Sequence, residues 1–335
     1  MNPPPFATHW ARELGAKEES LIQLKGGINN RVYRCGGGNA KWVVKGYSAI
    51  EEGQRDRMQA EVEFLTYAAD VSPQYVPQLI YVDSDHRCVV MEHIEGKTFL
   101  EGEVPSPEDI EAAVDFFRLL NSAGKVEKQH IQLDAAEGFL QLTDHIENVR
   151  ERLSKMSTDH LPPEARKPAV ELLQWVQDAA DRVSNLVAES ITKGTVANCI
   201  NPEQRCISPS DFGFHNAIRT KFGVKFFDFE FAGWDDPAKT ASDFVLQPRV
   251  PTRLQISPLL AALNDDTRGE IHVRCAVLGP MLRLKWALII LSVLQAERLD
   301  RLLATHPDTN PNELTNQRLK RATAYLREEM PFGLH

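Results

Sequence analysis

The sequence has few of the features that mark disulfide-stabilised, zinc-binding or exported proteins. Its five cysteines are odd in number and scattered, and none forms a Cys-x-x-Cys pair. This pattern argues against a disulfide framework and against a zinc site. The first residues contain no basic segment followed by an apolar run. We therefore predict no secretory signal and a reducing, cytoplasmic location.

Clusters of positive charge are also missing. The chain carries 38 Lys and Arg against 47 Asp and Glu, a formal net charge of −9, and we expect no nucleic-acid partner. The long apolar run at residues 275–295 holds Arg283 and Lys285 near its centre, where a bilayer would make these charges costly. We interpret it as a buried helix and expect no membrane association. The sequence leaves the oligomeric state open.

The first part of the chain is rich in strand signals. At 335 residues and 42% apolar content, the chain is long enough for two lobes. Residues 21–48 predict a three-strand meander, the stretch from about Gln54 to Ala69 has helical spacing, and strand character returns in PQLIYVD and RCVVMEHIEG. We predict a small antiparallel β-sheet lobe with one helix over residues 1–95.

After Ser106 the pattern becomes mainly helical. The spacing from Ser106 to Asp109 is a capping signature that precedes an apolar helical stripe. The strong strand signals of this half are confined to residues 204–232. Further amphipathic helices are predicted around residues 135–155, 164–189, 255–264, 268–298 and 311–329. Residues 96–335 are thus predicted to form a large helical lobe, and the fold class is α+β with two lobes.

The stretch CISPSDFGFHNAIRTKFGVKFFDFEF carries the clearest chemistry. A turn at Lys221–Gly223 between two short strands is expected to fold Asp228 back towards Asn216. Magnesium takes hard oxygen ligands, and phosphoryl transfer needs the metal, held phosphates and an oriented hydroxyl. Asn216 and Asp228 are therefore candidate Mg²⁺ ligands. Asp211 is the candidate catalytic residue, which accepts the proton of an attacking hydroxyl or orients it.

The strand-rich lobe offers groups that suit ATP. Lys45 ends the strand KWVVK, where its ammonium can reach phosphates, and Glu61 on the following helix can hold it in an ion pair. Glu63 competes for that pair, but Glu61 lies on the inner flank of the predicted helix.

Two further segments complete the predicted nucleotide site. Gly26, Gly27 and Asn30 lie in GGINNRVYRC, where the glycines let backbone N–H groups approach phosphate oxygens. The backbone from Glu92 to Ile94, at the end of VVMEHIEG, is expected to pair with an adenine edge.

The order of these motifs resembles that of the aminoglycoside phosphotransferase and choline kinase family, which phosphorylates small-molecule hydroxyls. The matching residues are GGINNRVY, Lys45, Glu61, MEHIEG, SDFGFHN, FDFEFAGWDDP and Asp243, from about residue 20 to about residue 245. The resemblance implies a bilobal protein-kinase-like fold, ATP between the lobes, Asp211 as the catalytic aspartate, and Asn216 with Asp228 as Mg²⁺ ligands. One position departs from the family pattern, because Pro209 stands where the family has a histidine.

Several residues have alternative interpretations. Asp228 can instead hydrogen-bond its own turn, and Lys45 can be a solvated residue at a strand end. His93 and His215 have no second metal ligand at the usual spacing, although His215 adjoins Asn216 and can approach a substrate. Asp235 and Asp236 either reach a substrate amine or stabilise their loop. Asp243 is assigned to the scaffold, and Trp234 and Trp286 to the core or a pocket wall.

The leading hypothesis is a kinase that transfers the γ-phosphate of ATP to a hydroxyl of a sugar, amino sugar or amino alcohol. Its acceptor is expected between the catalytic loop and the C-terminal helices. The alternative is a nucleotide-binding pseudokinase, suggested by Pro209 and opposed by the retained Lys45, Asp211, Asn216 and Asp228. A protein kinase is disfavoured, because DFEFAGWDDP replaces the usual activation segment. The choice between ATP and GTP stays open.

Overall fold

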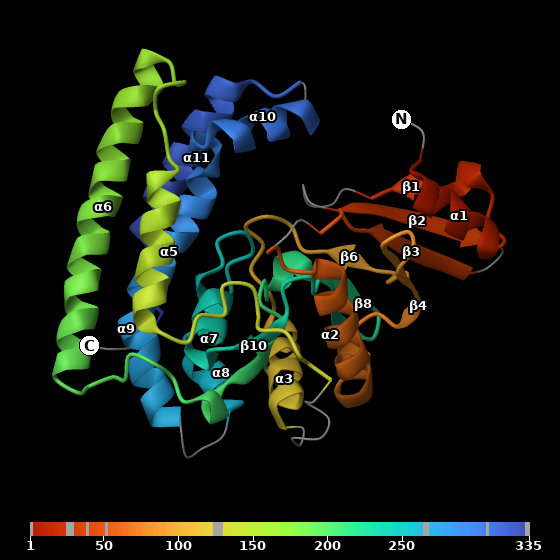
Figure 1. The fold of residues 1–335 in the computed structure, drawn as a ribbon, viewed down its shortest axis with the longest axis horizontal. Helices are drawn as coiled ribbons and strands as arrows, with labels where there is room; N and C mark the ends of the chain where they lie inside the picture. The colour runs from red at the N-terminus through yellow and green to blue at the C-terminus, as the bar shows by residue number, and fades with distance from the viewer. Residues whose placement is uncertain are drawn as a thin grey trace. The chain divides into compact units, whose positions relative to one another are not determined.

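The computed structural model describes residues 3–24, 30–37, 40–50, 53–122, 130–263, 268–305 and 308–331. The chain forms two compact units, each built from two segments (Figure 1). The first comprises Met1–Gly138 and Cys206–Asp235, and the second comprises Phe139–Arg205 and Asp236–His335. The lobe boundary predicted after residue 95 rests on composition rather than on contacts, and it stays a prediction.

A five-stranded antiparallel sheet forms the N-terminal part of the first unit, with strand order β1-β2-β3-β5-β4. The meander and the two later strands predicted from the sequence are all present. The strands are β1 (Ile22–Gln23), β2 (Arg31–Gly37), β3 (Ala40–Gly46), β4 (Leu79–Asp83) and β5 (Cys88–Glu92).

Side-chain alternation along β3 gives the sheet two different faces. Val44 packs in an apolar cluster with Ala11 of helix α1 (Pro5–Glu13). The next residue, Lys45, points to the opposite face, where its ammonium meets Glu61 of helix α2 (Arg57–Val71). The two helices therefore cover opposite faces of the sheet, and the strand period places Lys45 on the α2 side.

Helix α1 is an additional helix that the sequence analysis did not predict. Pro5 opens it, a position where the fixed φ of proline suits a first helical turn. The preceding prolines favour an extended chain, which obscured the short helical stripe. The predicted helix at Gln54–Ala69 is α2, which begins slightly later because Asp56 caps it by accepting hydrogen bonds from the N–H groups of Met58 and Gln59.

Helix α3 (Pro107–Ser122) carries the aromatic core of the first unit. Its predicted capping box is formed, since Ser106 N donates to Asp109 Oδ2 at 2.8 Å and Asp109 N donates to Ser106 Oγ at 3.3 Å. The ring of Phe116 stacks on Phe226 with centroids 5.2 Å apart and an interplanar angle of 6°. The remaining strands of this unit are β6 (Lys97–Thr98), β7 (Cys206–Ser208), β8 (Ala217–Thr220), β9 (Gly223–Phe226) and β10 (Gly233–Asp235).

The described part of the second unit is largely helical. Its α-helices are α5 (Leu142–Ser154), α6 (Pro163–Thr192), α7 (Pro237–Leu246), α8 (Ser257–Ala261), α9 (Arg268–Ile290), α10 (Ala296–Thr305) and α11 (Pro311–Leu326). Short 3₁₀ turns lie at η3 (Pro202–Gln204) and η6 (Leu291–Leu294) in this unit, and at η1 (Glu18–Ser20), η2 (Pro73–Tyr75) and η4 (Phe214–Asn216) in the first.

Two helical predictions in this unit need correction, and one helix was not predicted. Helix α5 begins at Leu142 rather than near residue 135, because Gln141 forms a bridge with Cys199. The helix predicted at 268–298 ends earlier, and α10 follows it after η6. Helix α7 was not predicted; it has only 10 residues, all of them buried, and its polar residues Lys239 and Asp243 form an ion pair one helical turn apart.

The apolar run near residue 280 forms α9 and the turn that follows it. The segment Arg268–Leu294 is long and apolar enough to cross a membrane by length and composition, but 72% of its apolar window is buried inside the protein. Its charged residues have partners within the second unit: Arg274 pairs with Asp236, Lys285 pairs with Asp243, and Arg283 donates to the carbonyl of Glu328. This is the arrangement of a core helix, as the sequence analysis predicted.

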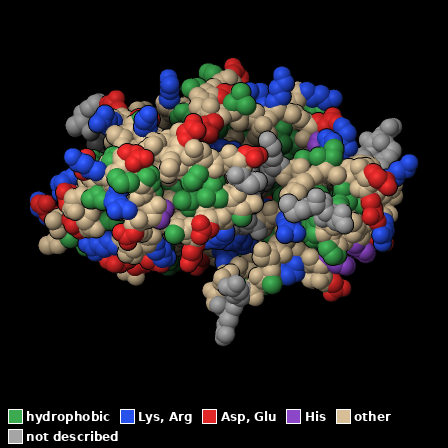
Figure 2. Space-filling view, turned by 90° about the horizontal axis from the view of Figure 1, so that it is seen from above, with side chains coloured by type: hydrophobic (Ala, Val, Ile, Leu, Met, Phe, Trp, Pro, Cys, Tyr) green, Lys and Arg blue, Asp and Glu red, His purple; other side chains and the backbone are tan. Residues whose placement is uncertain are grey.

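The surface mixes charges of both signs. Figure 2 shows one face of the molecule, on which acidic and basic side chains are interspersed among apolar and neutral ones. Such mixing is ordinary for a folded domain.

Candidate active site

The site begins with the hairpin of β8 and β9, which joins Asn216 to Asp228. The strands pair Ala217 with Phe226 and close at Thr220 and Gly223. One position further on, the N–H of Phe227 donates to the carbonyl oxygen of Asn216 at 2.9 Å. The predicted hairpin is therefore formed, and it places Asp228 directly after the residue that faces Asn216.

Asp211 lies beside the same hairpin, where the side chains of Asn216 and His215 contact it. Asn216 Nδ2 donates to the backbone carbonyl of Asp211 at 3.1 Å and to its Oδ2 at 3.2 Å. His215 Nε2 lies 3.0 Å from the other carboxylate oxygen, Oδ1. The His215 side chain is 7% exposed whereas that of Asp211 is 37% exposed. The Asp211 carboxylate is thus held by two neighbouring side chains and is still partly exposed to solvent.

Two residues of the site have unusual backbone angles. Ser210, just before Asp211, has φ of 64°, and Asp228 has φ of 69°. The left-handed region is disfavoured for residues other than glycine, and such outliers persist where the surrounding structure fixes them, often at functional sites. Ser210, which precedes the candidate carboxylate Asp211, is such an outlier. Asp228, the other candidate carboxylate, is one as well.

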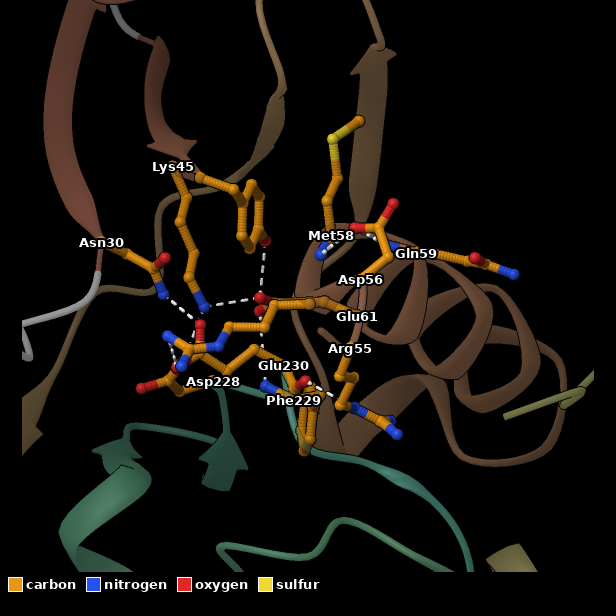
Figure 3. Close-up of polar contacts among 12 residues, drawn as sticks. Asn30, Lys45, Arg55, Asp56, Met58, Gln59, Glu61, Asp228, Phe229 and Glu230 are labelled. Atoms are coloured by element: carbon orange, nitrogen blue, oxygen red, sulfur yellow. Dashed lines mark hydrogen bonds and ion pairs between the residues drawn. The ribbon is translucent and has the colours of Figure 1, made fainter. Parts of the chain in front are cut away.

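Lys45 connects the hairpin to the sheet and to α2. Its Nζ lies 2.5 Å from Glu61 Oε2 and 2.5 Å from Asp228 Oδ1 (Figure 3). Tyr47, two residues along and on the same face, donates its hydroxyl to Glu61 Oε2 at 2.6 Å. The predicted pair of Lys45 and Glu61 is present, and Glu63 does not compete for it, because Glu63 Oε2 accepts from the N–H groups of Gln132 and Leu133.

The charges around Lys45 determine its ionisation. Burial by itself lowers the pKa of this ammonium, but the carboxylates of Glu61, Asp228 and Glu230 outweigh burial, and the pKa lies above its ordinary value. Burial and the Glu61 carboxylate together raise the pKa of Tyr47 well above its usual range. Lys45 is therefore charged and Tyr47 neutral across the physiological pH range.

Backbone contacts tie the segment after Asp228 to α2. Glu61 Oε1 accepts from the N–H of Phe229 at 3.3 Å. Arg55 Nε donates to the carbonyl of Glu230 at 3.3 Å, and its terminal nitrogens donate to the carbonyls of Asp134 and Ala232. Glu61 and Arg55 thus hold the segment after β9, in which Asp228 lies (Figure 3).

The predicted phosphate loop is only partly described. Gly26 and Gly27 lie outside the described residues. Asn30 is described, and its Nδ2 donates to Glu230 Oε2 while its Oδ1 is buried without a partner among the described residues. Burial raises the pKa of Glu230, and nearby Asp228 raises it further, against the opposing effect of Lys45. The assignment of Gly26, Gly27 and Asn30 to nucleotide binding stays a prediction.

The predicted hinge residues lie at the end of β5. Glu92 pairs with Trp42 of β3, and its carboxylate accepts from Lys225 Nζ at 2.9 Å and from Gln78 N at 3.1 Å. Ile94 is buried. The Glu92 side chain is thus engaged within the first unit, and the adenine contacts assigned to the backbone of Glu92 and Ile94 stay predictions.

Other candidates from the sequence have structural partners. Asp243 accepts from Lys285 Nζ at 2.8 Å and from Trp286 Nε1 at 2.9 Å, which fits a scaffold role. Asp236 caps α7 and pairs with Arg274. Trp234 Nε1 donates to the carbonyl of Ile131 at 2.8 Å.

Sequence reasoning missed three residues of this site. Tyr47 donates to Glu61, Glu230 adds a carboxylate near Lys45, and Arg55 holds the backbone after Asp228. A signal existed only for Tyr47, since the strand period puts residues 45 and 47 on one face. Arg55 acts on carbonyl groups that are distant in sequence, and no local pattern indicates such contacts.

Known proteins resemble this chain in sequence and in fold. The family model described as "Phosphotransferase enzyme family" matches residues 20–266. A search of the curated proteins finds no significant match.

Solved structures of similar fold cover nearly the whole chain. A choline/ethanolamine kinase family protein from Mesorhizobium loti is 18% identical, with 96% of this chain and 95% of that chain covered and a TM-score of 0.51. A spectinomycin phosphotransferase in complex with ADP and spectinomycin is 11% identical, with 91% and 92% covered and a TM-score of 0.54. An amicoumacin kinase in complex with AMP-PNP, Ca²⁺ and Ami is 13% identical, with 96% and 93% covered and a TM-score of 0.55. At these identities the likeness shows a shared kinase-like fold.

Proposed function

Since this chain belongs to the phosphotransferase enzyme family, we propose that it transfers the γ-phosphate of ATP to a hydroxyl group of a small molecule. One observation carries the proposal. Lys45 pairs with Glu61 and with Asp228, the N–H of Phe227, the residue before Asp228, donates to the carbonyl of Asn216, and the Asn216 amide donates to Asp211. All of these residues belong to the first compact unit, so the groups that phosphoryl transfer needs are held together in one structural unit.

Lys45 supplies the positive charge for the phosphates. Its pKa above the ordinary value keeps it an ammonium, and Glu61, only 1% exposed, holds it at the end of β3. A fixed cation stabilises the negative charge of transferring phosphate without reorganisation during the reaction. Tyr47 and the Phe229 N–H in turn hold the Glu61 carboxylate, so the position of the ammonium depends on both neighbours.

The residues present fit a bound Mg²⁺ ion. Mg²⁺ takes one or two protein oxygens and completes its shell with phosphate oxygens and water. The Asp228 carboxylate is 34% exposed, and the Asn216 amide nitrogen donates to Asp211, which turns the amide oxygen away from that carboxylate. Asp228 and Asn216 would hold the ion, which neutralises phosphate charge when bound.

Asp211 meets the acceptor. Its carboxylate has an exposed side, and both of its oxygens are positioned by neighbouring side chains. An aspartate in this state aligns a hydroxyl by accepting its hydrogen bond and takes the proton as the oxygen attacks phosphorus. The chain's own contribution is thus orientation of the hydroxyl at one oxygen and charge stabilisation at Lys45.

The acceptor class is proposed by analogy of fold. The similar structures include a choline/ethanolamine kinase family protein and proteins solved with spectinomycin and with Ami. We propose a sugar, amino sugar or amino alcohol as acceptor, and ATP as donor because two of these structures contain ADP or AMP-PNP.

The test follows ADP release from Mg-ATP, and separately GDP release from Mg-GTP, across a panel of sugars, amino sugars and amino alcohols. Wild type is compared with Asp211→Asn, which keeps the side-chain volume. We expect acceptor-dependent nucleotide turnover in the wild type only, and a product heavier by one phosphate in mass spectrometry. If nucleotide binds but no acceptor raises turnover above that of the variant, the alternative of a pseudokinase, motivated by Pro209, replaces the proposal.

A further inference from the structure

His215 is packed against the candidate catalytic carboxylate. It lies in the 3₁₀ turn η4, four residues after Asp211, with Nε2 at 3.0 Å from Asp211 Oδ1. The imidazole is 7% exposed, so water competes little for this contact. A hydrogen bond to a charged carboxylate in such a place is among the stronger kinds in proteins.

The other nitrogen of the His215 ring is buried. Within the described residues, His215 Nδ1 is buried and makes no hydrogen bond. A buried polar ring loses its hydrogen bonds to water. The contact with Asp211 compensates for this loss at Nε2. The hydrogen-bonding capacity of His215 is therefore directed to one oxygen atom.

The contact completes a two-sided hold on the carboxylate. Asn216 Nδ2 donates to Oδ2 at 3.2 Å, whereas His215 meets Oδ1. Rotation of an aspartate carboxylate about its last side-chain bond has broad minima, so the residue itself does not fix the plane. Two donors on two different oxygens do fix it. Removing the Nε2 contact takes away the His215 donor to Oδ1 and weakens the constraint on the plane of the carboxylate.

We propose that His215 is a positioning residue, which donates from Nε2–H to Asp211 Oδ1 and thereby sets the direction in which Asp211 meets the acceptor hydroxyl. This inference rests on the proposed function. It also gives a physical reading of Pro209, the residue that stands where the family pattern has a histidine. Proline offers no side-chain donor. In this chain the donor is instead His215, which follows Asp211 in the sequence.

Two substitutions of similar volume separate the hydrogen bond from simple packing. His215→Leu fills the space without a donor, whereas His215→Gln fills it with an amide N–H. We expect Leu to lower kcat by about 10- to 100-fold, because misplacing a catalytic group by about 1 Å costs up to about 10²-fold. Gln should restore kcat to within about threefold of wild type. KM for ATP should stay within about twofold for both variants, as expected when an interaction of the transition state alone is lost.

Two controls accompany the kinetics. The Mg²⁺ concentration for half-maximal rate should not change in His215→Leu, because Asn216 and Asp228 keep their side chains. Unfolding in urea should show that both variants are folded. Equal kcat values for the Leu variant and the wild type would overturn the inference. Equal losses in Leu and Gln would assign His215 to packing and overturn it too.

A second measurement does not depend on turnover. Crystal structures of the two variants should show the Asp211 carboxylate rotated in His215→Leu and unchanged in His215→Gln. An unmoved carboxylate in the Leu variant would refute the positioning role even if no acceptor had been found. The two proposals fail separately: absence of turnover in the wild type counts against the kinase, whereas full activity of His215→Leu counts against the positioning residue alone.

Discussion

Lys45 and Asp228 are 183 positions apart in the sequence, and their side chains form an ion pair of 2.5 Å. The same Nζ contacts Glu61 at 2.5 Å. One ammonium thus joins the central strand of the sheet, helix α2 and the hairpin that carries the candidate metal ligands. The consequences for stability and for activity can be measured separately.

Replacing Lys45 should destabilise the protein because it leaves buried carboxylates without their cation. Lys45→Met leaves Glu61, 1% exposed, unpaired, and breaking a buried pair by removing one partner costs about 3–5 kcal/mol. In the double variant Lys45→Met/Glu61→Gln, the free energy of unfolding should recover by about half or more. Urea unfolding of the four proteins of this cycle tests the expectation. A double variant less stable than the Lys45→Met single would contradict it.

Loss of a proposed magnesium ligand should change the Mg²⁺ requirement of the reaction, and not only the affinity for the nucleotide. For Asn216→Ala and Asp228→Asn, we expect the Mg²⁺ concentration for half-maximal ADP release to rise by about tenfold or more. Asp85→Asn, an exposed carboxylate, is the matched control and should behave as wild type. Magnesium titrations at fixed ATP measure the effect. An unchanged magnesium requirement in both variants would remove these residues from the proposed metal site.

Asp236 should contribute to stability by two separable contacts. Its Oδ1 accepts from the N–H of Ala238 at 2.8 Å, which caps α7, and its Oδ2 pairs with Arg274 Nε at 2.5 Å. Asp236→Ala removes both and leaves Arg274 buried, so we expect a loss of about 3–5 kcal/mol. Asp236→Asn keeps a capping oxygen and should be about 1 kcal/mol more stable than Ala. Thermal and urea unfolding measure the difference, and equal stability of the two variants would refute the capping contribution.

Unfolding should depend on pH through His145. Burial, followed by the nearby cations Lys239, Lys285 and Arg274, lowers the pKa of this imidazole well below its usual 6.5. Below pH 6.5 the unfolded chain therefore binds a proton that the folded chain excludes. Stability from this residue is complete above that pH and falls by about 1.4 kcal/mol per pH unit as the pH decreases.

The matched variant for this prediction is His145→Gln, which has no titrating group. The difference in unfolding free energy between wild type and variant should be constant above about pH 7 and should change below pH 6.5 with the slope given above. Urea unfolding at several pH values gives both curves. Parallel curves from pH 7 to pH 5 would show that His145 is not excluded from protonation in the folded state.

Much of the site could be predicted because its geometry follows from short-range rules. The hairpin turn explains why Asp228 returns to Asn216, and the strand period explains why Lys45 faces α2 rather than α1. Helical spacing correctly selected Glu61 over Glu63. In each case the sequence separation within one element sets the direction of a side chain.

The remaining features depend on contacts that no local pattern contains. Arg55 acts on carbonyl groups of Asp134, Glu230 and Ala232, and Ser210, the residue before Asp211, adopts a left-handed backbone that its residue type does not favour. Tertiary structure overrides local signals at these places.

The split of the first compact unit between two distant segments bears on its biosynthesis. The ring of Phe116 on α3 meets Phe212, Phe226 and Phe229, which the ribosome adds only after all of α5 and α6. Until then Phe116 has only its earlier aromatic partners, Phe64 and Tyr75, and the side that later meets these three rings stays uncovered. Polypeptides released before residue 235 would therefore be candidates for chaperone retention, and translation pauses within 139–205 would prolong that exposure.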